Sequence, residues 1–158
     1  MTGSFVRAAL ADVQSRATTL ATSLSERGFE VVRTKIEQHG RLDDVAVTPS
    51  PTSYFEYHAK LVLPSPNDPV IDVVHAHGGS LSANVANTPP LARGAGAKGT
   101  ERFLTLRPFG LARAEADARF AALLAAIAAC GVATRGRVRE YTVLDTNPAL
   151  DRGWIDAS

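Results

Sequence analysis

The sequence predicts a single α+β domain in which one antiparallel sheet carries two long helices on one of its faces. Two long segments repeat apolar residues at helical spacing, and several shorter segments alternate apolar and polar residues as strands do. The helical segments do not alternate regularly with the strands, which favours an α+β over an α/β fold. The chain has 158 residues, the usual size of one domain, so we expect residues 1–158 to form one unit.

The first long helix is expected over residues 4–27. Its apolar residues recur at three- and four-residue steps, which places them on one stripe. The stripe consists of Val6, Leu10, Val13, Ala17, Leu20 and Leu24. Gly28 can end this helix, because glycine adopts the left-handed conformation that closes many helices. Residues 29–37 then alternate apolar and charged side chains, which predicts a strand.

The middle of the chain shows the clearest strand pattern, over residues 53–63, where apolar and polar side chains alternate. Three prolines within residues 64–69 end this strand, because proline cannot donate to a sheet ladder. Residues 70–74 form a short apolar run that fits either a helix or a strand. We expect a glycine turn and a short strand over residues 75–85, and a loop over residues 87–100.

The last third of the chain predicts a strand over residues 102–109, a second long helix over residues 112–130 and a final strand over residues 137–145. The apolar stripe of this helix consists of Ala116, Phe120, Leu123, Leu124 and Ile127. The tail that follows is rich in turn residues. This order of helices and strands resembles a split βαβ, ferredoxin-like arrangement, which we take as the expected topology.

The composition excludes some classes of protein. The net charge of +1 argues against nucleic acid as a partner, because domains that bind it are usually strongly basic. The single cysteine, Cys130, cannot form an intrachain disulfide, which fits a reducing compartment. The N-terminus lacks the pattern of a signal peptide, and no apolar run is long enough to cross a bilayer. We therefore expect a cytoplasmic protein without a membrane partner.

The outward positions of the strands carry long ionisable side chains, which point to a binding surface. Neighbouring strands lie about 4.8 Å apart, so such side chains can reach one another. We expect them to form a polar, partly basic floor on the open face of the sheet. Such a floor suits a small anionic molecule, a phosphoester or a carboxylate, because arginine binds these groups through paired hydrogen bonds. Charged residues on a solvated sheet face are also normal, so a purely structural interpretation stays open.

His58 is the candidate acid–base group of this surface, because imidazole titrates near neutral pH. Glu56, two residues before it on the same strand face, is the candidate for orienting it, and the pair would suit a hydrolase. The candidate substrate-binding residues are Lys60, Arg33, Lys35, Arg107, Arg139 and Tyr141 on the strands, and His77, Ser80, Ser82 and Asn84 around the glycine turn.

The sequence gives no positive sign of a metal or a cofactor, and we expect neither. His75 and His77 offer two imidazoles, but a metal site needs one or two further ligands. The glycine-rich segments 78–84 and 94–99 do not match a phosphate-binding P-loop.

The alternative function is a non-catalytic module that uses the same sheet face for protein interaction or for pairing with a second copy as a homodimer. Binding of RNA on the sheet is a weaker alternative, because the strands lack an exposed pair of aromatic residues for base stacking.

Overall fold

The computed structural model describes residues 3–38, 50, 52–65, 68–83 and 100–151. Its elements follow one another as α1 (Leu10–Glu26), β1 (Lys35–Gln38), β2 (Tyr54–Leu63), α2 (Val70–Ala76), β3 (Gly79–Ala83), β4 (Thr100–Leu106), α3 (Arg113–Ala129), β5 (Thr134–Asp145) and the short 3-10 turn η2 (Pro148–Asp151). The five strands form one sheet in the order β1-β5-β2-β4-β3. Every neighbouring pair is antiparallel. The predicted α+β class with an antiparallel sheet is therefore confirmed.

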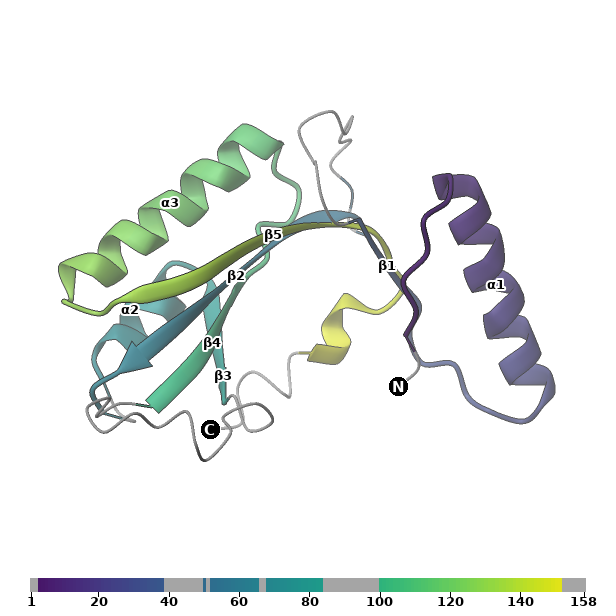
Figure 1. The fold of residues 1–158 in the computed structure, drawn as a ribbon, viewed down its shortest axis with the longest axis horizontal. Helices are drawn as coiled ribbons and strands as arrows, with labels where there is room; N and C mark the ends of the chain where they lie inside the picture. Colours follow the sequence, from purple (N-terminus) through teal and green to yellow (C-terminus); the bar gives the residue numbers. More distant parts are fainter. Residues whose placement is uncertain (1–2, 39–49, 51, 66–67, 84–99, 152–158) are drawn as a thin grey trace.

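The core lies between one face of the sheet and the helices α2 and α3. Alternate residues of β2 point into it, because successive side chains of a strand project to opposite faces. These are Phe55, Tyr57, Ala59, Leu61 and Leu63, all of them buried. The apolar stripe of α3 is buried against them, as the sequence predicts. In Figure 1, α3 lies over this face of the sheet and η2, drawn in yellow, lies on the opposite side.

The prediction that two long helices cover one face is not confirmed. None of the described residues of α1 is buried, and α1 makes at most marginal contact with any other helix or strand. Figure 1 shows α1 beyond the edge strand β1, apart from α2 and α3. The second helix of the covered face is instead the short α2, which packs against α3 and β3.

Two further elements differ from the sequence prediction. Residues 70–74, which fit either type, belong to helix α2, where Val70 and Val74 lie one turn apart and are both fully buried. The strand expected over residues 29–37 is reduced to β1, and Phe29 and Val32 are exposed. A strand forms only where a neighbour accepts its hydrogen bonds, and the pairing of β1 with β5 begins at Lys35.

Candidate functional site

The face of the sheet opposite α2 and α3 carries most of the predicted site residues. On β2 these are Glu56, His58 and Lys60, which alternate with the core residues. The register places Thr105 of β4 across from His58, and Glu140 of β5 across from Glu56. The sequence prediction that ionisable side chains gather on this face therefore agrees with the geometry of the central strand.

Glu56 is the centre of the charges on this face. Only 2% of its side chain is exposed. Arg107, just after β4, donates to Oε1 from Nε at 2.9 Å and from Nη2 at 2.7 Å. Lys35, at the start of β1, donates from Nζ to Oε2 at 2.6 Å. Burial by itself would raise the pKa of Glu56, but the hydrogen bonds and charge of Arg107 and the charge of Lys35 outweigh it, and the pKa lies below its ordinary value.

Asp145, at the end of β5, is a second buried carboxylate near the same end of the sheet. Arg33 donates to it from Nε at 2.9 Å and from Nη2 at 2.6 Å, and the hydroxyl of Tyr54 donates at 2.6 Å. The backbone N–H of Asn147 donates a further bond at 3.1 Å. Burial raises the pKa of Asp145, but the hydrogen bonds from Arg33, Tyr54 and Asn147 lower it by more. Both buried carboxylates are therefore fixed as anions at neutral pH.

Asp151, on η2, joins the two arginines. Its Oδ1 accepts from Nη1 of Arg33 at 2.7 Å, and its Oδ2 lies 2.9 Å from Nη2 of Arg107. Each carboxylate oxygen thus contacts a different guanidinium. We call the connected set the ionic network; it consists of Arg33, Lys35, Glu37, Glu56, Arg107, Asp145 and Asp151. It unites residues far apart in the sequence at the end of the sheet where β2 begins.

His58 borders the ionic network. Its Nδ1 lies 3.1 Å from the hydroxyl of Thr105. Its Nε2 lies 3.6 Å from a carboxylate oxygen of Glu56 and 3.6 Å from one of Glu140. The side chain keeps 18% of its surface exposed, so it is partly accessible to solvent. An imidazole between two carboxylates, held by a hydroxyl, has the partners that a proton-transfer group needs.

Arg139 and Tyr141 do not join the predicted floor. The register places Arg139 across from Tyr57, so both point towards the helices. There Arg139 contacts Asp117 of α3 at 3.1 Å, and the hydroxyl of Tyr57 donates to the same carboxylate. Tyr141 belongs to the core, with its ring 5.1 Å from that of Phe55. Residues 139 and 141 share a face, as expected, but it is the face opposite His58.

The other predicted residues lie towards the edges of the site or outside it. Lys60 pairs with Glu101 at 3.2 Å, further along β2. Ser80 donates to the carbonyl of Thr105 at 3.3 Å from the edge strand β3, and Ser82 lies two residues further on. His77 is the residue after α2 and has no described contact with His58. Asn84 lies outside the described residues.

Two residues that the geometry makes central, Asp151 and Tyr54, are not among those predicted from the sequence. In the sequence Asp151 belongs to a turn-rich tail, and no local pattern indicates that it reaches two arginines more than forty residues away. Tyr54 had a weak signal, because it has the same strand parity as Glu56 and His58 and therefore shares their face.

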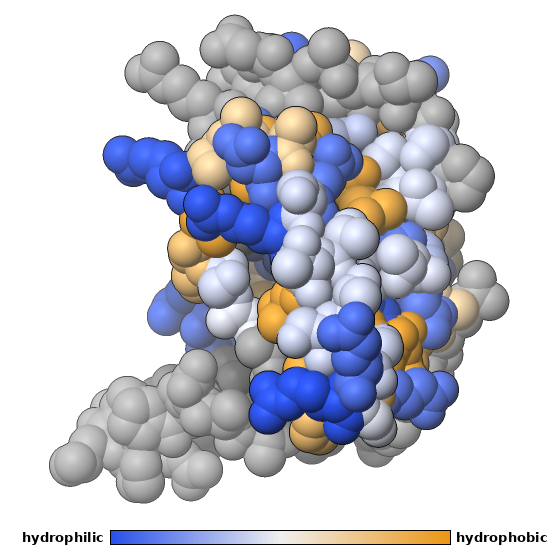
Figure 2. Space-filling model, turned by 90° about the vertical axis from the view of Figure 1, so that its right-hand side faces the viewer, coloured by the Kyte–Doolittle hydropathy of each residue, from blue (hydrophilic) through white to orange (hydrophobic). Residues whose placement is uncertain are grey.

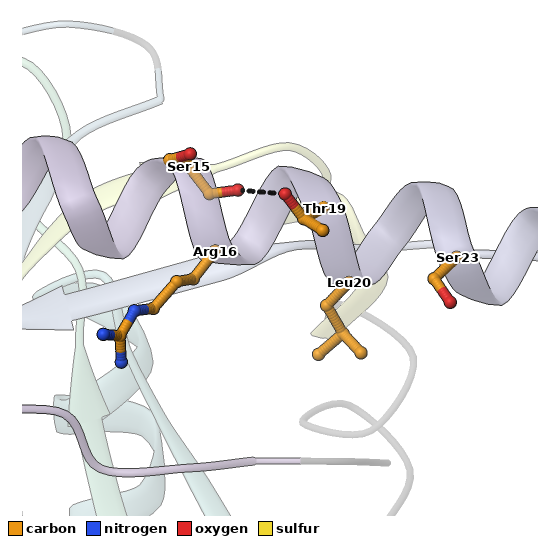
Figure 3. A pocket seen from close by; sticks show the side chains of 5 residues that line it. All are labelled: Ser15, Arg16, Thr19, Leu20 and Ser23. Atoms are coloured by element: carbon orange, nitrogen blue, oxygen red, sulfur yellow. Dashed lines mark hydrogen bonds between the residues drawn. The ribbon is translucent and has the colours of Figure 1, made fainter.

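Two surface depressions among the described residues lie away from the ionic network. Figure 3 shows one along α1, lined by Ser15, Arg16, Thr19, Leu20 and Ser23. All five residues belong to one helix, so this is a shallow surface feature. The other depression lies between α3 and the start of β5. Within the described ranges, no group of three or more His, Cys, Asp or Glu side chains is arranged to hold a metal ion.

Comparisons with known proteins add no assignment: no family model, curated protein or solved structure matches the chain. Among the helices described, none has the length and apolar character needed to span a membrane.

Proposed function

We propose that this chain binds a small molecule with a carboxylate or phosphate group on the open face of its sheet. Arg33 and Arg107 would hold the anionic group, and His58 would transfer a proton to or from the bound molecule. The observation that carries the proposal is the convergence of two guanidinium groups, each held in place by a buried carboxylate. A guanidinium oriented in advance loses less conformational entropy when it binds an oxyanion.

The energetics of the ionic network support a role in binding or catalysis in addition to a role in stability. Taking charges out of water is expensive, and a well-packed apolar cluster often stabilises a fold as well as a buried ion pair does. Here Glu56 and Asp145 are almost completely buried, and their pKa values are displaced from the ordinary ones. Titratable groups with displaced pKa values are concentrated at binding and catalytic sites.

The contacts of His58 support the catalytic form of the proposal. A general acid or base needs one ring nitrogen held in place and the other available for proton transfer. Thr105 holds Nδ1, while Nε2 lies between Glu56 and Glu140. In a hydrolase, this nitrogen would exchange a proton with the substrate or with a water molecule, and Thr105 would orient the ring through Nδ1. Glu56, the residue expected from the sequence to orient the ring, lies 3.6 Å from Nε2 instead.

The topology of the main body supports a fold of the same kind as the one expected. We propose that β2, α2, β3, β4, α3 and β5 form a split βαβ, ferredoxin-like unit to which α1 and β1 are added. These elements follow one another in the chain as strand, helix, strand, strand, helix and strand. In the sheet they take the order β5-β2-β4-β3. The proposed site is the face that the two helices of this unit leave uncovered.

The binding proposal is tested by isothermal titration calorimetry with inorganic phosphate and with succinate. Arg107→Lys keeps a positive charge near Glu56 but removes the planar fork, so we expect it to weaken binding by about tenfold or more. The matched control is Arg119→Lys, which changes an exposed arginine on α3, on the other side of the sheet. Equal affinities for the wild type and Arg107→Lys would refute the proposed site.

The proposed role of His58 in proton transfer is tested with a separate variant. His58→Gln removes the titrating ring and keeps hydrogen-bonding groups at the position. We expect this variant to bind phosphate with unchanged affinity and to lose turnover of a phosphomonoester such as p-nitrophenyl phosphate. Turnover equal to that of the wild type would remove His58 from the mechanism while leaving the binding site intact.

A second candidate function is self-association through α1, and the exposure of its apolar stripe favours it. We propose a homodimer in which two copies of α1 pair. The stripe residues Leu10, Val13, Ala17, Leu20 and Leu24 are separated by alternating steps of three and four, as in a coiled-coil seam. Such a seam is complementary to another of the same spacing, and a second copy of the chain presents one.

Light scattering tests the homodimer. The wild type is expected to be dimeric and Leu20→Glu monomeric, because the new charge would lie within the seam. The control Thr19→Glu adds the same charge next to the seam on the same helix and should leave the dimer intact. A monomeric wild type would refute self-association.

A further inference from the structure

The contacts of Asp151 resemble those that a bound ligand would make. Its two carboxylate oxygens accept from two different guanidinium groups, at 2.7 Å from Arg33 and at 2.9 Å from Arg107. A carboxylate or phosphate group of a ligand would bind two arginines through the same kind of bridging contacts. The subsite that the proposed function needs is therefore already filled by a side chain of the same protein.

Asp151 is the most exposed of the three carboxylates that contact an arginine in the ionic network. Its side chain is 27% exposed, whereas those of Asp145 and Glu56 are 0% and 2% exposed. Asp145 also has bonds from Tyr54 and from a backbone N–H, and Glu56 has bonds from Lys35. Removing either would leave a guanidinium buried without its partner, whereas removing Asp151 leaves each arginine with its own buried carboxylate.

The segment that carries Asp151 can move at low energetic cost. The 3-10 turn η2 has four residues and none of them is buried. Moving it away therefore exposes little apolar surface, and burial of apolar surface is the main term that holds an element in place. Short segments with few buried contacts open locally far more often than the core does.

We propose that Asp151 is an internal competitor that occupies the anion subsite of Arg33 and Arg107, and that a ligand binds by displacing it. This inference rests on the proposed function. Without Asp151, the positive charges of Arg33, Lys35 and Arg107 are balanced by Glu37, Glu56 and Asp145. An incoming carboxylate then restores the charge of the closed state, so the exchange replaces one bridging anion by another.

Competition of this kind sets the affinity. A ligand that binds only the open form has its affinity reduced by the fraction of molecules that are open. Only ligands with an oxyanion able to bridge both arginines would displace Asp151 effectively. The turn would therefore select ligands of that kind. Ligand binding would also release η2 from the sheet.

The test compares the wild type with Asp151→Asn, which keeps the shape of the side chain and removes its charge. Titration with inorganic phosphate and with succinate should show about tenfold tighter binding to the variant. The matched control is Glu101→Gln, which removes one negative charge beside Lys60, away from the two arginines. It should bind both anions as the wild type does. Tighter binding of phosphate alone or of succinate alone would identify the anion that the subsite prefers.

Hydrogen exchange on the wild type gives a second readout that does not depend on any variant. Saturating phosphate should increase amide exchange of Leu150, whose N–H bonds to the carbonyl of Asn147 within the turn. Equal affinities of the wild type and Asp151→Asn, with both weakened by Arg107→Lys, would refute the internal competitor and leave the proposed function standing. Absence of anion binding to both proteins would refute the subsite itself, and the anionic ligand with it.

Discussion

The helices α1 and α3 have the same length of 17 residues and each carries an apolar stripe, yet they have opposite environments. In α3, Leu123 and Ile127 are completely buried under the sheet. In α1, Leu10 and Leu20 keep 47% and 49% of their surface exposed. Figure 2 looks onto the side of the molecule that carries α1, and apolar side chains are visible there beside weakly polar ones.

The connections of the two helices explain this difference. Helix α3 joins β4 to β5, which lie on either side of β2, so its two ends are fixed and its stripe lies over the central strand. Helix α1 is followed by the short edge strand β1, so the strand next to it in the chain lies at the edge of the sheet and not at its centre. An apolar stripe therefore predicts that a helix forms, but the place of the neighbouring strands in the sheet decides whether the sheet of the same chain covers it.

Hydrogen exchange should show the largest difference between the two helices. An isolated helix near this length is only marginally stable in water, so in the dissociated monomer the amides of α1 should exchange through local opening with little protection. The amides of α3 should exchange only when the domain unfolds, which costs about 5–15 kcal/mol. We expect at least about a thousandfold difference in protection. Similar protection of both helices in the monomer would show that α1 packs against its own chain.

The substitution Glu56→Gln tests the centre of the ionic network on the sheet. It leaves Arg107 and Lys35 without the charge of their buried partner, and removing one partner of a buried pair costs about 3–5 kcal/mol. The control is Glu26→Gln at the exposed end of α1, which should change the free energy of unfolding by less than about 0.5 kcal/mol. Urea unfolding measures both. A small effect at Glu56 would show that solvent screens the pair.

The same carboxylates predict how stability depends on pH. The pKa values of Glu56 and Asp145 lie below their ordinary values of 4.5 and 3.8 in the folded chain. The unfolded chain therefore takes up these protons first as the pH falls. Their contribution is complete above pH 4.5 and is lost as the pH falls through the ordinary values towards the lower folded ones. Glu56→Gln should flatten this dependence, and an unchanged dependence would place the acid-sensitive groups elsewhere.

Leu123→Ala and Leu20→Ala compare the two apolar stripes directly. Leu123 is completely buried, so the truncation should cost about 2–5 kcal/mol. Leu20 is half exposed and α1 makes at most marginal contact with the strands, so in the dissociated monomer the same truncation should stay within about 0.5 kcal/mol. Thermal or urea unfolding distinguishes them. Equal costs would contradict the separate environments of the two helices.

How much of this structure the sequence could predict depends on whether each feature is determined by a local sequence pattern or by contacts between distant segments. The alternation along β2 and the stripe of α3 are local, and they identify the core face and the shared face of Glu56 and His58. For β5 the pattern could not decide: one set of alternate positions holds Arg139, Tyr141 and Val143, and the other holds Val138, Glu140 and Thr142. Both sets mix polar and apolar residues, so the orientation depends on pairing with β2.

The register of that pairing also contains an irregularity that no short pattern predicts. His58 lies across from Val138, but Lys60 lies across from Arg135, so β5 has one extra residue there. Gly136 has a φ of 58°, a left-handed conformation that suits glycine at such a bulge. The ionic network could not be predicted from the sequence for a different reason: Arg33, Arg107 and Asp151 meet only after the whole sheet has formed.

The smallest expected change in stability concerns the buried hydroxyl group of Thr142. Thr142 is completely buried on β5, across from Tyr54, and its hydroxyl has no hydrogen-bond partner among the described residues. A buried hydroxyl without a partner is destabilising, and valine has nearly the same shape without the polar atom. Thr142→Val should therefore raise the free energy of unfolding by about 1 kcal/mol.

The matched change on α1 is Thr19→Val. The hydroxyl of Thr19 is exposed and donates to the carbonyl of Ser15, 3.0 Å away on the same helix. Valine and threonine have similar helix propensities, so this change should leave stability within about 0.5 kcal/mol of the wild type. A loss of stability in Thr142→Val would instead show that the buried hydroxyl is satisfied, and that the polar contacts of this face extend beyond the ionic network along β5.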